Sequence, residues 1–213
     1  MRVTRERAAQ NRAALLREAS RLFRERGIDG VGVAEICKAA GLTHGALYAQ
    51  FPSKEALAAE ALAEGLKGSG ARLDKLAARA EPTLAELLEY YISRRHREDL
   101  AFGCPLAASA SEIARQDRSV SATFVEGFER MVGRIEATLH DVPPAQRRNR
   151  ALTIAAAQLG VLAVSRAAAK ADNGLSNAVL AAGRQVLEEL GHAAPTRPRR
   201  RAPRHPRSDK RRR

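Results

Sequence analysis

Apolar residues recur at the spacing of an α-helix along most of the chain. In residues 4–26 one helical face carries Leu15, Leu16, Ala19, Leu22 and Phe23. No stretch shows the alternation of apolar and polar residues that a β-strand requires, and no Asn-Gly or Asp-Gly joins two such stretches. The pattern therefore predicts an all-α protein of about nine helices.

Residues 31–54 predict two short helices joined by a tight turn. The first has an apolar stripe at i, i+3, i+4 and i+7, formed by Val33, Ile36, Cys37 and Ala40. Gly41 follows the last of these and suits a helix C-terminus, and Thr43 is a good N-cap for the next helix. Leu47 and Phe51 are expected in the core. A helix, a glycine turn and a second helix are the pattern that places a recognition helix in the DNA major groove.

Six further helices are predicted after this motif. They cover residues 54–79 with Ser53 as the cap, 83–98, 105–115, a helix from either Asp117 or Ser119 to 139, 145–171, and 176–190 with Ser176 as the cap. The last two carry more apolar surface than one buried face needs, at Ile154, Leu159, Val161, Leu162, Val164, Val179, Leu180, Val186 and Leu187. Pairing of two chains through these helices would bury this surface and predicts a homodimer. The alternative is that a single chain buries both faces.

The positive charge lies at the two ends of the chain. The net charge is +13, and residues 195–213 contain ten Lys and Arg with one acid. Residues 1–54 contain ten Lys and Arg with five acids, so the middle is nearly neutral. This distribution favours a DNA-binding head on a neutral body. The tail from Pro195 is expected to be disordered and either solvated or a source of non-specific attraction to DNA.

Other classes of site are poorly supported. Cys37 and Cys104 have no metal-ligand spacing, so neither a zinc site nor a disulfide framework is indicated, and no cofactor is expected. The five histidines are scattered and no catalytic motif accompanies them, which argues against an enzyme. Polar residues interrupt the apolar stretch 151–169, and the N-terminus has no export signal. We therefore expect a cytoplasmic protein without a membrane partner.

Residues 31–57 resemble the signature of the TetR/AcrR family of transcriptional regulators. The resemblance rests on Ala34 and Ile36, on Ala40-Gly41-Leu42-Thr43, on Gly45-x-Leu47-Tyr48, and on Phe51-x-Ser53-Lys54-Glu55-x-Leu57. It implies a helix-turn-helix DNA-binding domain at residues 1–52, a helical effector-binding and dimerisation domain at 53–194, and leaves 195–213 as a basic tail. It also implies a homodimer on double-stranded DNA with a palindromic operator.

The same resemblance implies DNA contacts from Thr43, His44, Gly45, Tyr48 and Lys54. Hydroxyl groups and an ammonium group suit phosphate oxygens, His44 suits a base edge, and Gly45 allows close approach. Thr43 equally suits a helix cap alone, and Tyr48 could belong partly to the core.

The effector is expected to be a small molecule bound in the larger domain. The large or polar candidates for its pocket are Tyr91, His96, Phe102, Cys104, Phe124, Phe128, Met131 and Gln158. The segment Gly103-Cys104-Pro105-Leu106, with Ser111-Glu112, also resembles TetR-like sensors of electrophiles and quinones. Cys104 is therefore either a sensor thiol or a small buried side chain.

These features together predict a regulator, most simply a repressor released from its operator by a small molecule or an electrophile. The alternative function is a non-specific, nucleoid-like DNA-binding protein that uses the basic tail.

Overall fold

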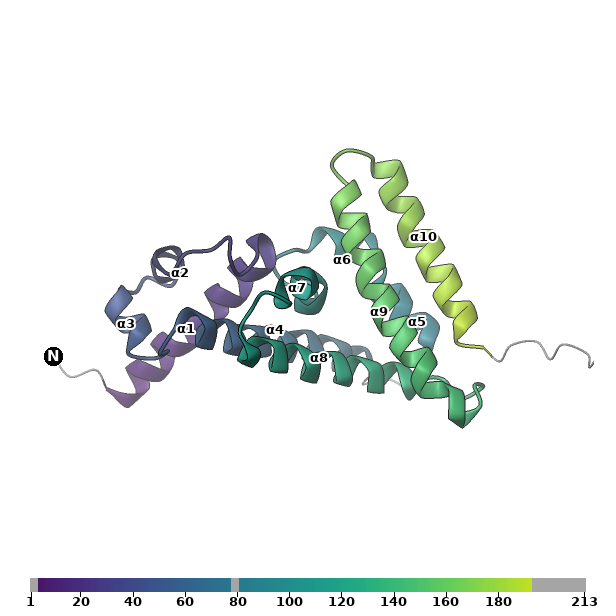
Figure 1. Cartoon of the computed structure of the whole chain (residues 1–213), viewed down its shortest axis with the longest axis horizontal. Coiled ribbons are helices and arrows are strands. Elements are labelled where there is room, and N and C mark those ends of the chain that lie inside the picture. Colours follow the sequence, from purple (N-terminus) through teal and green to yellow (C-terminus); the bar gives the residue numbers. More distant parts are fainter. Residues whose placement is uncertain (1–3, 78–80, 193–213) are drawn as a thin grey trace, which may run out of the picture.

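The computed structural model describes residues 4–77 and 81–192, and the basic tail 195–213 lies outside them. Within these ranges the chain has ten helices and no strand, as the all-α prediction requires. Their bounds are α1 (Arg5–Arg26), α2 (Val33–Ala39), α3 (His44–Tyr48), α4 (Lys54–Ala77), α5 (Leu84–Tyr91), α6 (Arg94–Glu98), α7 (Pro105–Ile113), α8 (Arg118–Glu136), α9 (Pro144–Ala168) and α10 (Asn173–Leu190). In Figure 1, α1–α3 form one end of the molecule, and α9 and α10 stand together at the other.

The helix-turn-helix motif forms at α2 and α3 as the sequence predicts. Gly41 has a φ of +67°, which only glycine adopts without strain, and it turns the chain so that Leu42 N–H donates to the Cys37 carbonyl at 2.8 Å. The Thr43 hydroxyl then accepts from the amide of Ala46 and caps α3. Leu47 and Phe51 are completely buried, as predicted.

Two hydrophobic clusters form the core. Helix α4 is part of the first cluster and also contacts the second. The first cluster joins α1–α3 to the start of α4, where Leu57 and Leu62 are buried. The second joins α5, α8, α9 and α10. Leu66 of α4 packs against both clusters. Helix α4 also runs along α8, where the side chain of Leu66 fills the space that a Cβ at Gly127 would occupy. This close approach requires glycine in the middle of α8.

The predicted single helix over residues 83–98 is wrong. It is divided into α5 and α6, because the Ser93 hydroxyl accepts from the amide of His96 and starts a new helix. The prediction that Ser176 caps the last helix is also wrong. The carboxylate of Asp172 is the cap, at 2.8 Å from the Leu175 amide, while Ser176 is buried and hydrogen-bonded to Ser165.

The apolar residues of α9 and α10 divide between the core and the surface. Five of the nine that suggested an excess are buried within the chain: Ile154, Leu159, Leu162, Leu180 and Leu187. Val164 and Val186 are more than half exposed. Among the described residues α9 is the one helix long and apolar enough to cross a membrane, but its buried face is part of the second cluster, as in a core helix.

Candidate DNA-binding face and effector cavity

The residues for which the resemblance implies DNA contact gather around α3. Thr43, His44, Gly45 and Tyr48 are exposed, and Lys54 at the start of α4 is half-buried. Tyr48 is 54% exposed, so its ring does not belong to the core. The Thr43 hydroxyl caps α3, and the residue is nevertheless exposed to solvent, so capping does not prevent a contact with DNA.

The internal packing gives no reason for glycine at position 45. A Cβ there would meet only the Thr43 hydroxyl, at 3.9 Å, and the backbone is an ordinary helix. Nearby, Lys38 and Lys54 form no ion pair with any residue that the structure describes. This face therefore presents free cations and an uncovered stretch of backbone, which are features that suit close contact with a phosphate backbone.

A cavity of about 520 Å³ lies in the larger part of the molecule, among α4, α5, α6, α8, α9 and the start of α7 with the segment before it. Six of the eight predicted pocket residues line it: Tyr91, His96, Phe102, Cys104, Met131 and Gln158. Phe124 and Phe128 do not. Their rings stack with centroids 6.4 Å apart, and both pack against the hydrophobic clusters instead.

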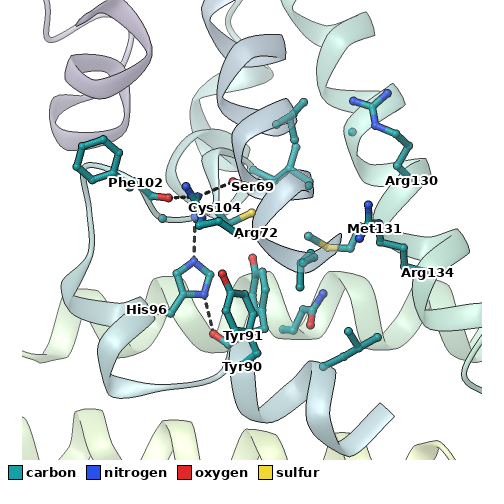
Figure 2. Close-up of a pocket in the computed structure, with 18 of the residues that line it drawn as sticks. Ser69, Arg72, Tyr90, Tyr91, His96, Phe102, Cys104, Arg130, Met131 and Arg134 are labelled. Atoms are coloured by element: carbon teal, nitrogen blue, oxygen red, sulfur yellow. Dashed lines mark hydrogen bonds between the residues drawn. The ribbon is translucent and has the colours of Figure 1, made fainter. Parts of the chain in front are cut away.

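The sequence reasoning missed the arginines of the cavity. Arg72, Arg95, Arg130 and Arg134 line it, together with a single carboxylate, that of Asp99. Figure 2 shows Arg130, Met131 and Arg134 together on α8, on the side of the cavity away from His96 and Phe102. The spacing of Arg130, Met131 and Arg134 places them on one helical face. Because Met131 was a predicted pocket residue, this spacing could have identified both arginines as lining the same pocket.

His96 connects the end of α5 to the start of α7. Its Nδ1 lies 2.8 Å from the Tyr91 carbonyl, and its Nε2 accepts from the Cys104 amide at 2.9 Å. A proton on Nδ1 satisfies both bonds, so the ring is neutral. Burial, followed by smaller effects that include nearby arginines, lowers the pKa of His96 to about 4. Both ring nitrogens are occupied, and the ring offers a ligand only its carbon atoms.

Tyr91 and Cys104 meet on the inner wall of the cavity. Both side chains are buried, and the Tyr91 hydroxyl has no hydrogen-bond partner among the described residues. Burial, and then the neighbouring Cys104 thiol, raise the pKa of Tyr91 well above its ordinary value, so the hydroxyl remains a proton donor. The Tyr91 ring meets the His96 ring edge-to-face, with their centroids 4.7 Å apart (Figure 2).

Helix α7 joins this cavity to the DNA-binding end. It begins immediately after Cys104, and near its other end the Glu112 carboxylate accepts from the amides of Ile28 and Asp29, at 2.9 and 2.8 Å. These amides belong to the loop between α1 and α2. Arg24 of α1 also donates to the Ala101 carbonyl at 2.7 Å. The head is thus held by the segment that forms the cavity wall.

Comparison with known proteins agrees with this architecture. Residues 15–61 match the model of the bacterial regulatory proteins of the tetR family. This match covers most of the head and the start of α4, so the head is a DNA-binding segment of the tetR type. Over 59 residues it is 41% identical to the HTH-type transcriptional regulator AcrR of Shigella flexneri, which is 28% of this chain and 27% of that protein. The similarity in sequence to this relative therefore spans little more than a quarter of its length.

Solved structures of TetR proteins extend the likeness in fold to most of the chain. The reduced form of NemR from E. coli superposes with a TM-score of 0.66 at 19% identity, covering 82% of this chain and 95% of that one. A TetR-family regulator from Agrobacterium tumefaciens gives 0.68 at 20% identity, covering 85% and 98%. The likeness confirms the predicted all-α fold, with the helix-turn-helix domain at the N-terminus.

Proposed function

We propose that this protein acts as a TetR-family regulator, a homodimeric repressor that a small molecule releases from a palindromic operator. The two heads of a dimer would read half-sites about one helical turn apart, ~34–36 Å. His44 is proposed to reach a base edge, while Thr43, Tyr48 and Lys54 contact phosphate and Gly45 allows close approach.

One observation carries the proposal of ligand control. The cavity and the head share α7, because Cys104 lines the cavity at one end and Glu112 binds the head loop at the other. A ligand that displaces the start of α7 changes the position of Glu112. The ligand then favours a separation of the two heads that does not fit the operator, which is a shift in population between two arrangements.

The proposed dimer uses the outer faces of α9 and α10. Val164, Leu175 and Val186 are each more than half exposed there. Alanines and Gly160 accompany them on the exposed side, and small side chains allow helices of two chains to approach closely. A mass of one chain by light scattering at micromolar concentration would contradict the dimer.

A second mode of release is the modification of Cys104 by an electrophile. Cys104 lines the cavity and directly precedes α7, so a group added to its sulfur would occupy the space beside Tyr91. Mass spectrometry of protein treated with a quinone that releases DNA tests this. An unmodified Cys104 in the released protein excludes it.

The decisive experiment selects bound sequences from a random DNA pool. A palindrome with two half-sites would support specific binding and the dimer together, whereas a uniform pool would favour the nucleoid-like alternative. The selected operator then serves in a release assay with candidate ligands. A regulator of this kind acts on chromosomal DNA, so we propose a cytoplasmic location.

A further inference from the structure

The positive charge of the cavity wall is only partly balanced by the residues that the structure describes. Arg134 is paired with Asp74 at 2.8 Å, whereas Arg130 makes only a long ion pair with Glu126, at 4.0 Å. Arg72 donates to neutral groups, the Ser69 hydroxyl and the Phe102 carbonyl. Asp99, the one acid in the lining, accepts from the Phe102 amide. The cavity therefore has an excess of positive charge.

The rest of the wall is apolar and suits a hydrocarbon body. Leucines from α4, α5 and α7 line it together with Met131 and Ile135 of α8; they are Leu66, Leu73, Leu87 and Leu106. A volume of about 520 Å³ lies within the range of about 300–1,000 Å³ that small-molecule sites occupy. His96 adds no charge, because its ring is neutral at physiological pH.

A second polar feature lies on the inner wall. The Tyr91 hydroxyl is buried, lines the cavity and has no partner within the described residues. A buried hydroxyl without a hydrogen-bond partner destabilises the protein, so a ligand whose oxygen accepts a hydrogen bond from it gains affinity. Gln158, only 4% exposed, lines the same cavity and offers a further polar group.

We propose that the effector is an amphipathic organic anion. Its carboxylate lies at Arg130 and Arg134, its apolar body lies along the leucines, and a second oxygen accepts from Tyr91. This inference rests on the proposed function, which requires a ligand in this cavity but does not say which kind. The four-residue spacing of Arg130 and Arg134 on α8 places both guanidinium groups on one face of the helix.

Three flexible probes of equal chain length test the proposal with the full-length protein. They are 9-oxodecanoate, its primary amide, and decanoate without the ketone, each titrated by calorimetry. The acid is expected to bind about tenfold more tightly than the amide, and this ratio should fall as salt is added. The ketone is expected to strengthen binding several-fold over decanoate.

Variants assign each part of the preference to its residue. Arg130→Gln should reduce the acid-to-amide ratio, while Arg130→Lys should retain most of it. Arg118→Gln, an exposed arginine at the start of the same helix and outside the cavity, is the matched control and should leave the ratio unchanged. Tyr91→Phe should remove the advantage of the ketone over decanoate. Equal binding of acid and amide to the wild type, or binding of neither, overturns the proposal.

A parallel assay separates this inference from the proposed function. Operator release is followed by fluorescence anisotropy at saturating concentrations of each probe. If acid and amide bind equally and both release DNA, the anion preference is wrong and the regulator stands. If the acid binds preferentially through Arg130 and Tyr91 without any release, the anion site stands and ligand control through this cavity is wrong.

Discussion

The two hydrogen bonds of Glu112 allow a quantitative test of how the head is held. Its carboxylate accepts from the amides of Ile28 and Asp29, one bond to each oxygen. Glu112→Gln keeps the shape of the side chain but replaces one acceptor oxygen with an NH2 group, which faces an amide donor. Hydrogen bonds to a charged group contribute about 1.5–3 kcal/mol each, and partial exposure here reduces this. We expect a loss of about 1–3 kcal/mol in the free energy of unfolding.

This loss corresponds to a decrease of roughly 2–4 °C in Tm for each kcal/mol, for a chain of this size. Hydrogen exchange locates the effect. Protection of the Ile28 and Asp29 amides should fall, while amides in the middle of α1 should keep theirs. Glu64→Gln is the control, because Glu64 is an exposed glutamate of α4 without a hydrogen bond to any described residue. Wild-type Tm and unchanged protection of Ile28 in Glu112→Gln would refute the reasoning.

Four further outcomes are expected. His44→Ala should reduce the preference for operator over random DNA, since His44 is exposed at the start of α3, and an equal loss on both DNAs in a competition assay would move base reading to another residue. Deletion of residues 195–213 should weaken binding to all DNA and reduce its salt dependence, whereas a complete loss of operator preference would favour the nucleoid-like alternative. His96 has a pKa of about 4 when folded and 6.5 as its ordinary value, so the unfolded state binds more protons between these values. The free energy of unfolding should therefore fall by up to about 3 kcal/mol as the pH decreases from 6.5 to 4. Denaturant unfolding of His96→Gln should show a smaller fall over the same pH range, and an equal fall would assign the effect to other groups. Gly127→Ala should lower the free energy of unfolding by about 1–3 kcal/mol, because its Cβ would collide with Leu66, and Gly133→Ala, which meets no neighbour, should not.

Local sequence signals predicted the head well. The positions of Gly41 and Thr43 are determined by helix ends, and those of Leu47 and Phe51 by helical spacing, so no distant part of the chain was needed. Ser93 shows the limit of this reasoning. The helical spacing of the residues before it predicted one continuous helix. The Ser93 side chain instead caps a new helix, α6, and the spacing of apolar residues carries no information about such a cap.

The cavity was predicted less completely, because it forms from elements far apart in the sequence. Large and polar residues were reasonable candidates, yet Phe124 and Phe128 face the hydrophobic clusters while Arg130 reaches the cavity from the same helix. The choice between these faces depends on where α4 packs against α8. The role of Glu112 depends on an 84-residue separation from Ile28, which no local pattern encodes.

The separation of the exposed and buried sides of α3 has a consequence for the evolution of this protein. Leu47 anchors the helix in the core, whereas His44, Gly45 and Tyr48 remain on the surface. Substitutions at these exposed positions leave the core contacts of the head intact. Under the proposed DNA reading by this face, single mutations that retain folding would change the target sequence, and the head would be a suitable starting point for engineering new DNA specificity.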